Sequence, residues 1–404
     1  MGFFFTLLDD SLRPKGSRDP LGIEHVWSQV GRRLVGNLTT VTGHLDNFIL
    51  ALLGFHLAQA EPDVPPGWPA FQRFEQIAAR ARKLRGHQGI RGDRLARLDG
   101  RGPVPLGEGR QAAILQDAVR SGLWGLYASP LAATGLCQYD RRPCGAGAEI
   151  AEQFRMALRP CWSTWLQEAM SADQVSYDDL AALAPKLERL LDAPAPRRRL
   201  AEILLDGGDA PPPWQGPLLE RATAFVARGG TLTTPAVFEH LAEGDDPLAD
   251  YARRVIALES LLVLARVLFN YLLGCRDRPL ADLSRGLTVL EARSDRTGLL
   301  FPEFPEITNR AWLERRRGLC KFADAARERR WTDAVRTLLE HHAGVMRARG
   351  TPAWAFLDGE RLKVLMGSGS DLRAEDRVGW DNGYFVTPLL AILEQSRRPM
   401  DRQA

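Results

Sequence analysis

The stretch Tyr251–Gly274, YARRVIALESLLVLARVLFNYLLG, is the best candidate in the chain for a membrane-spanning helix, and its character decides the fold class. A spanning helix needs about 20 nearly uncharged residues. Arg253, Arg254, Glu259 and Arg266 interrupt this run, which therefore predicts a buried core helix and no membrane partner. Four leucines at three- and four-residue steps should face the core; these are Leu261, Leu264, Leu268 and Leu272.

Helical periodicity covers much of the remaining chain. In Phe71–Leu84, FQRFEQIAARARKL, the apolar residues recur at helical spacing. Further helices are predicted at about 23–35, 41–58, 111–128, 130–134, 148–158, 162–193, 310–329, 331–349 and 384–395. Around Asp358-Gly359 the period becomes alternating, which predicts a β-hairpin over 354–366 with these two residues as its turn. The sequence thus predicts a mainly α, multi-helical fold with small β-hairpins.

Proline-rich stretches suggest where the chain divides. Glu61–Pro69 interrupts the helical pattern, while Ala193–Pro196 and Pro211–Pro213 resemble linkers. We therefore predict an N-terminal helical segment at 1–69 and a winged-helix domain at 70–160. A helical middle region at 161–247 and a C-terminal helical domain with a β-hairpin at 248–404 follow.

The winged-helix prediction rests on Gly135–Phe154, GLCQYDRRPCGAGAEIAEQF. A helix end runs into a short semi-apolar strand, then Arg141, Arg142 and a proline, and a new helix opens near Ala148. This outline predicts a hairpin near 136–146. It fits a wing that contacts nucleic acid, a winged-helix scaffold for protein contact, or a plain hairpin between core helices. The short helix before it offers Ser129 and Thr134 but no arginine, asparagine or glutamine to read base edges.

Composition places the chain among ordinary globular proteins, with 45% hydrophobic and 25% charged residues and a net charge of +3. Only five of the 53 Lys and Arg residues are lysines. Phosphate recognition would favour arginine, but a GC-rich coding genome explains a surplus that is spread along the whole chain. The five cysteines show no zinc spacing and no secreted disulfide framework, which favours reduced thiols and a cytoplasmic location.

The candidate nucleic-acid-binding residues are six arginines. A Gly/Arg-rich loop at 86–109 supplies the first four and the hairpin supplies the other two: Arg91, Arg94, Arg97, Arg101, Arg141 and Arg142. Guanidinium groups of this kind contact phosphates and fix position without reading sequence. These residues therefore predict DNA binding through the phosphate backbone.

The sequence contains no motif that identifies a catalytic activity. It contains no Walker-type ATP site, no H-E-x-x-H, no G-x-S-x-G and no dinucleotide fingerprint. Asp358, Glu360 and Lys363 faintly resemble a nuclease centre, yet E-x-x-K spacing places the last two on opposite faces of a strand. The adjacent His341 and His342 cannot share one helix face and are a poor metal pair. We therefore predict no catalytic residue, no metal site and no cofactor.

Several phrases, in order along the chain, resemble helical proteins encoded in bacterial anti-phage defence and restriction loci. They are DPLGIEHVWSQVGRRLVGNLTTVT at 19–42, FQRFEQ at 71–76, GLWGLYASPLAATGL at 122–136, GAGAEIAEQF at 145–154 and GYFVTPLLAIL at 383–393. The hairpin departs from the usual pattern at Cys144-Gly145, which puts the length of the wing in question. The resemblance implies a non-enzymatic component of a protein complex that works beside an ATPase, helicase or nuclease.

Three functions follow as hypotheses. The first is a nucleic-acid-associated or adaptor subunit of a bacterial defence-type complex. The second is a purely structural protein–protein scaffold, and the third is a nuclease-like enzyme with a dispersed site. A salt-dependent DNA-binding assay separates the first two, because phosphate contacts lose affinity steeply with salt.

Overall fold

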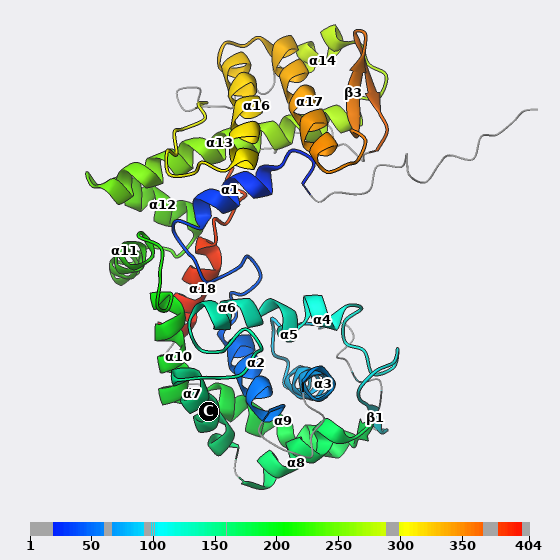
Figure 1. The fold of residues 1–404 in the computed structure, drawn as a ribbon, viewed down its shortest axis with the longest axis vertical. Coiled ribbons are helices and arrows are strands. Elements are labelled where there is room, and N and C mark those ends of the chain that lie inside the picture. Colours follow the sequence, from blue (N-terminus) through cyan, green and yellow to red (C-terminus); the bar gives the residue numbers. More distant parts are fainter. Residues whose placement is uncertain are drawn as a thin grey trace, which may run out of the picture. The chain divides into compact units, whose positions relative to one another are not determined.

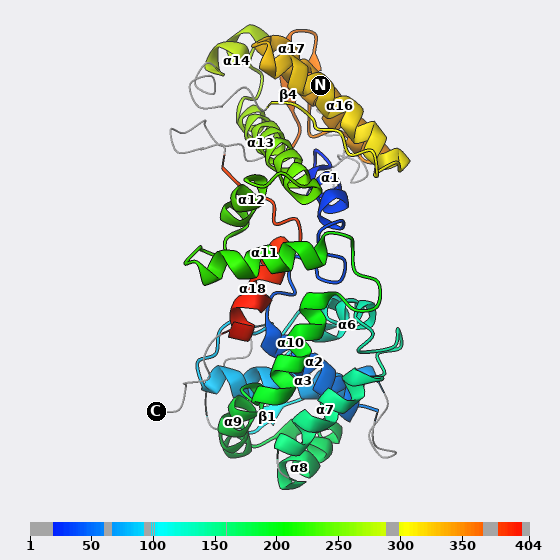
Figure 2. The same ribbon diagram turned by 90° about the vertical axis from the view of Figure 1, so that its left-hand side faces the viewer.

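Helices dominate the described part of the chain in the computed structural model (Figures 1 and 2). The structure describes residues 19–59, 67–92, 98, 100, 102–158, 160–287, 299–366 and 379–397. Within these residues the only sheets are two small antiparallel ones of two strands each. The predicted mainly α fold with small β elements is confirmed.

The chain divides into two units that each combine distant segments. Unit 1 comprises residues 1–32 and 235–384, and unit 2 comprises 33–234 and 385–404. The first helix therefore belongs with the second half of the chain, and the last helix belongs with the first half. The four consecutive domains predicted from the proline-rich stretches do not coincide with these units.

Unit 1 is built around the long helix predicted from Tyr251–Gly274. Its elements are α1 (Ile23–Gly31), most of α12 (Thr234–Ala242), α13 (Pro247–Gly274), α14 (Leu280–Gly286), α16 (Arg310–Arg327), α17 (Trp331–Ala348), β3 (Ala355–Asp358) and β4 (Arg361–Val364). Helices α16 and α17 lie side by side, and α17 also contacts α13, α14 and β3.

Helix α13 begins where the sequence supplies a strong N-terminal signal. The Asp246 side chain accepts hydrogen bonds from the backbone N–H groups of Leu248 and Ala249, and Pro247 occupies the first turn. All four predicted leucines are fully buried. The helix is long and apolar enough to cross a bilayer, but 67% of its most apolar window is buried inside the protein. This burial is typical of a core helix in a soluble protein.

The hairpin predicted over 354–366 is present as β3 and β4, with its turn displaced by one residue. Asp358 pairs with Arg361, so the loop residues are Gly359 and Glu360 rather than Asp358 and Gly359. Gly359 has a positive φ of 58°, which suits a tight turn. This register buries Leu362, Val364 and Ala355 on one face of the hairpin. The register is therefore fixed, because a shift by one residue would expose this face.

Unit 2 is a helical assembly in which α2 and α3 form the centre. Its elements are α2 (Leu45–Leu57), α3 (Trp68–Leu84), β1 (Val104–Pro105), α4 (Ala118–Ser121), α5 (Leu123–Leu126), α6 (Ala128–Ala133), α7 (Ala146–Ala157), α8 (Pro160–Ser171), β2 (Gln174–Val175), α9 (Tyr177–Leu191), α10 (Pro194–Asp206), α11 (Gln215–Ala227) and α18 (Val386–Arg397). Helix α2 contacts α3, α7 and α10, while α3 contacts α8 and α9.

Two predicted helices of unit 2 are broken where side chains or strands intervene. The predicted helix at 111–128 is wrong, because α4 ends before Gly122 and α5 restarts at Leu123. The buried Glu75 carboxylate accepts the Leu123 N–H at 2.6 Å and replaces the helical carbonyl partner. The predicted helical stretch at 162–193 is likewise interrupted by β2. Ser176 then caps α9 by accepting the Asp179 N–H.

The stretch Ala193–Pro196, which resembles a linker in the sequence, is the beginning of α10. Pro194 stands in the first turn, where a missing N–H costs nothing because the first helical N–H groups have no partner within the helix.

The segment predicted as a wing is a tight turn between α6 and α7. Cys137 and Pro143 form a single antiparallel bridge in place of paired strands. The Gln138 N–H donates to the Arg142 carbonyl at 2.8 Å, and the Cys144 N–H donates to the Leu136 carbonyl at 3.1 Å. The segment therefore folds back on itself as predicted, but it is shorter than a two-stranded wing.

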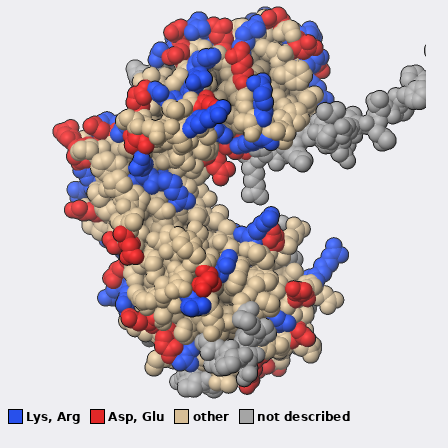
Figure 3. All heavy atoms as spheres, in the orientation of Figure 1, with Lys and Arg blue, Asp and Glu red and all other residues tan. Residues whose placement is uncertain are grey.

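Figure 3 shows acidic and basic side chains interspersed over the face in view, without a continuous field of one sign among the coloured residues. A surface of this kind does not by itself favour a polyanion, because duplex binding relies on concentrated positive charge.

Candidate functional site

The six candidate arginines do not form one cluster in the described part of the chain. Arg94, Arg97 and Arg101 lie outside the described residues. Arg91 lines a large pocket in unit 2, whereas Arg141 and Arg142 belong to the turn between α6 and α7.

Arg141 and Arg142 have different environments within this turn. The Arg141 guanidinium lies 4.3 Å from the centroid of the Trp124 ring, and its Nε donates to the Trp124 carbonyl at 3.3 Å. Burial lowers the pKa of Arg141 below its ordinary value. Arg142 is exposed and pairs with Asp140 at 3.4 Å. Arg141 is therefore engaged within the protein, and Arg142 is the outward-facing cation of the two.

A pocket in unit 2 has a volume of about 1450 Å³. Four separate segments line it: the stretch before and at the start of α2, the loop after α3, the α9–α10 junction and one face of α18. Their charged side chains are Arg85, Arg91, Arg189, Arg197, Asp46, Glu188, Asp192 and Glu394. Four arginines thus balance four carboxylates.

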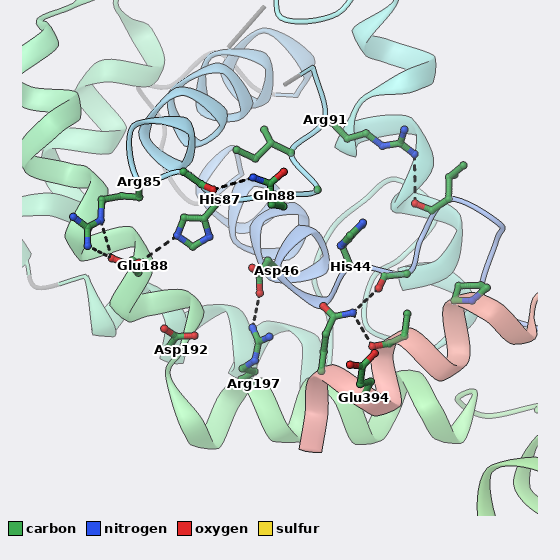
Figure 4. A pocket seen from close by; sticks show the side chains of 18 of the residues that line it. His44, Asp46, Arg85, His87, Gln88, Arg91, Glu188, Asp192, Arg197 and Glu394 are labelled. Atoms are coloured by element: carbon green, nitrogen blue, oxygen red, sulfur yellow. Dashed lines mark hydrogen bonds and ion pairs between the residues drawn. The ribbon is translucent and has the colours of Figure 1, made fainter. Parts of the chain in front are cut away.

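One wall of the pocket is organised by Glu188 on α9. Arg85 donates to Glu188 Oε2 from Nε and lies within 2.9 Å of it with a second guanidinium nitrogen. His87 Nε2 lies 3.5 Å from Glu188 Oε1. Figure 4 shows Arg85 and His87 converging on this carboxylate from the loop after α3. The contact ties that loop to α9.

A second carboxylate, Asp46 in the first turn of α2, lies between two arginines. Arg197 donates to Asp46 Oδ1 at 2.6 Å and to the Leu191 carbonyl at 2.8 Å. Behind it, the buried Arg82 approaches Asp46 Oδ2 at 3.7 Å and donates to Asn47 Oδ1 at 2.8 Å. Arg197 therefore reaches Asp46 from the pocket (Figure 4), while Arg82 supports it from the core.

His44 stands at the start of α2 with an exposed imidazole. Among the described residues no hydrogen bond engages this ring, although it packs so closely on Gly89 that a Cβ there would lie 2.6 Å from the ring. Partial desolvation lowers the pKa of His44, and the nearby charge of Arg82 lowers it further. The imidazole is thus neutral near pH 7 and can donate or accept a hydrogen bond.

The pocket could not be assembled from the sequence. Arg197 and Asp46 are 151 residues apart in the chain, and no local pattern links them. Of the pocket residues, only Arg91 is among the sequence-predicted site residues. The sequence predicts a Gly/Arg-rich loop at 86–109, and Gly86 and Gly89 in this loop both have positive φ values in the structure.

The residues of the nuclease-like hypothesis do not converge with one another. Lys363 Nζ binds Asp277 Oδ1 at 2.7 Å, and Glu360 pairs with Arg336. Among the described residues no group of three or more His, Cys, Asp or Glu side chains is placed to hold a metal ion. The adjacent histidines are buried and bind backbone carbonyls of residues 20 and 21.

Comparisons with known proteins add no relative to this picture. No family model, curated protein or solved structure matches the chain.

Proposed function

We propose that the protein is a non-enzymatic adaptor subunit of a bacterial defence-type complex, and that its unit 2 pocket binds a charged polypeptide segment of a partner protein. The defence context comes from the resemblance of the sequence phrases, which implies an ATPase, helicase or nuclease as the partner. The pocket supplies the binding site. Its balanced ionic lining is the observation that carries the proposal.

The size of the pocket favours a polypeptide over a small metabolite. Pockets for drug-sized ligands measure about 300–1,000 Å³ and are lined mainly by apolar and aromatic groups. This pocket is larger, at about 1450 Å³, and many of its lining residues are charged or polar. An extended peptide offers backbone amides and side chains of both signs, which match such a lining.

The charge balance argues against a polyanion in the same pocket. A nucleic acid strand is bound chiefly by releasing counterions from its phosphates, which requires a surplus of cations. Here Glu188 and Asp46 already hold Arg85 and Arg197. A phosphate would have to displace these carboxylates and would then face them at short range.

The ion pairs also prepare the pocket for binding. The ion pairs of Arg85 with Glu188 and of Arg197 with Asp46 join separate segments and already fix these side chains. Binding of a ligand therefore costs little further side-chain entropy. His44 adds a neutral imidazole that can bond a peptide group. The pocket therefore offers fixed charges at its walls and one adaptable polar group.

The test is selection of peptides on the immobilised full chain from a phage-displayed library of random linear peptides. Selected sequences are then synthesised, and their affinity is measured by calorimetry. The combined substitutions Arg189→Glu and Glu394→Lys reverse two exposed charges of the lining while conserving net charge. We expect this variant to bind selected peptides at least about tenfold more weakly, which corresponds to about 1.4 kcal/mol.

The matched control carries Arg198→Glu and Glu202→Lys. Both residues are exposed on α10, and neither lines the pocket. Peptide affinity should be unchanged in the control. Failure to select any peptide, equal binding by both variants, or nuclease activity of the purified chain would contradict the adaptor proposal.

A further inference from the structure

Tyr139 is the most exposed large apolar side chain in the described part of the chain. It stands in the turn between α6 and α7, and 93% of its surface is accessible. Its sequence neighbours Gln138 and Asp140 are polar, and Arg142 follows closely. An aromatic ring that stays in water at a tight turn contributes little to the fold.

Three hydrogen bonds of the turn's backbone hold it folded. The Gln138 N–H donates to the Arg142 carbonyl at 2.8 Å, and the Arg141 N–H donates back to the Gln138 carbonyl at 2.9 Å. Asp140 Oδ1 accepts the Arg142 N–H at 3.0 Å. These bonds hold Tyr139 at the apex.

Arg141 anchors this turn to the core in an unfavourable backbone conformation. Its φ is 71°, a left-handed value that non-glycine residues rarely adopt. The guanidinium nevertheless stacks on Trp124, which packs edge-on against Phe55, Phe71 and Trp68. Strained residues of this kind persist where the surrounding structure holds them in place, and they gather at functional sites.

We propose that this turn binds single-stranded nucleic acid, with an unpaired base stacked on the Tyr139 ring and the adjoining phosphate bound by Arg142. The ring is open to a base, and every base has a π-face. The Arg142 guanidinium is two-thirds exposed beside it. Its ion pair with Asp140 lies in water, where such pairs contribute little, so a phosphate can replace Asp140 there more easily than at the partly buried ion pair of Arg197 with Asp46.

The polar surroundings of Tyr139 favour this ligand over a protein partner. A protein hot spot requires a ring of neighbouring contacts that excludes water. The flanking residues Gln138, Asp140 and Arg142 offer no apolar rim. Stacking of a single base needs only the ring and a nearby cation, which are the two groups the turn presents.

The proposed site does not need base-reading side chains on the short helix α6. Stacking tolerates any sequence, whereas major-groove reading needs polar groups aimed at base edges. Neither Tyr139 nor Arg142 lines the peptide-binding pocket, so the two proposed sites can be tested independently.

The experiment measures binding of a fluorescein-labelled oligothymidylate to the full chain by fluorescence anisotropy, with the corresponding duplex as competitor. We expect the single strand to bind more tightly than the duplex. Tyr139→Ala should weaken binding by roughly 5- to 150-fold, the range measured for loss of one stacked base. Tyr139→Phe should bind like the unchanged protein, because it keeps the ring. Arg142→Ala should reduce the slope of log affinity against log salt by about 0.7.

The matched control is Met156→Ala, which removes another large side chain of unit 2 that is 70% exposed. It should leave binding unchanged, and melting temperatures should show that every variant folds. Absence of oligothymidylate binding, a preference for duplex, or equal binding by Tyr139→Ala and the unchanged protein would overturn the proposal. If Tyr139→Ala still bound the oligothymidylate but no longer bound the selected peptides, the turn would be a site for a protein partner instead.

Discussion

The Tyr384 hydroxyl donates a 2.7 Å hydrogen bond to Oε2 of Glu259, 125 residues earlier in the chain, and both residues are buried in unit 1. Glu259 Oε1 accepts the backbone N–H groups of Asp381 and Asn382 at 2.6 and 2.9 Å. Oε2 also accepts the Asn382 side-chain amide at 2.8 Å. One carboxylate on α13 therefore anchors the whole segment 381–384.

Removal of this carboxylate should destabilise unit 1 strongly. Glu259→Ala leaves several donors unpaired in a buried site, each at about 1–3 kcal/mol, so we expect a loss of at least about 3 kcal/mol in the free energy of unfolding. Tyr384→Phe removes one of these bonds and should cost about 1 kcal/mol. Urea unfolding followed by tryptophan fluorescence measures both. The control is Glu340→Ala, at an exposed site on α17, which should change the free energy of unfolding by no more than about 0.5 kcal/mol. If Glu259→Ala changed it no more than this control, the anchor would not be formed.

The stability of unit 1 should also fall in acid because of two buried histidines. The His341 Nε2–H donates to the Leu21 carbonyl at 2.7 Å. His342 Nε2 accepts the Trp354 N–H at 2.8 Å, so its Nδ1 must carry the proton that bonds the Pro20 carbonyl. The bond from Trp354 thus requires a neutral His342, whereas His341 is kept neutral by its burial. Burial lowers the pKa of His341 to about 4 and lowers that of His342 as well.

A histidine whose folded-state pKa is depressed stabilises the protein fully above its ordinary value of 6.5 and loses this contribution as the pH falls toward the folded value. The free energy of unfolding should therefore decline between pH 6.5 and about 4, by about 1.4 kcal/mol per pH unit for each histidine that remains neutral. His341→Gln keeps a side-chain donor but does not titrate, so its decline should be shallower. An unchanged pH profile in this variant would contradict the assignment.

Glu75 should give unit 2 a pH dependence of the opposite sign. Burial raises its pKa to about 7, against the lowering effects of the Leu123 N–H bond and of Arg91. A carboxyl group whose folded-state pKa is raised stabilises the fold fully below its ordinary value of 4.5, and this contribution is lost as the pH rises toward 7. Glu75→Gln is uncharged and can still accept the Leu123 N–H. It should match the unchanged protein near pH 4.5 and be about 1–3 kcal/mol more stable at pH 8.

Hydrogen exchange of unit 2 peptides at both pH values measures the Glu75 effect separately from unit 1. A stability difference that stays constant with pH would show that Glu75 titrates normally.

The parts of the fold that were predictable from the sequence are those with a strong local signal. The buried face of α13 follows from the spacing of its leucines, and the β3–β4 hairpin follows from Asp358-Gly359, although its register required burial of Leu362 to settle. The break at Gly122 was missed because its cause, Glu75, lies 48 residues away. The pocket was not predictable for the same reason, because its residues are far apart in the sequence. Its ion pairs join α2 to α10 and the loop after α3 to α9.

The two arginines of the turn between α6 and α7 should differ when each is removed. Arg141→Ala loses the stack on Trp124 and the bond to its carbonyl, and alanine retains the unfavourable left-handed φ. A cation–π contact and a hydrogen bond each contribute about 0.5–2 kcal/mol, so we expect a loss of about 1–3 kcal/mol. Arg142→Ala removes an exposed side chain and should stay within about 0.5 kcal/mol.

Thermal melting of both single variants and the double variant measures this difference. The double variant should melt close to Arg141→Ala, because Arg142 adds little to stability. Arg141→Lys keeps the charge but loses the planar group and Nε, so it should recover only part of the loss. Equal melting temperatures for Arg141→Ala and the unchanged protein would mean that the stack on Trp124 does not hold the turn. Tyr139 would then lose the rigid support on which the proposed stacking site depends.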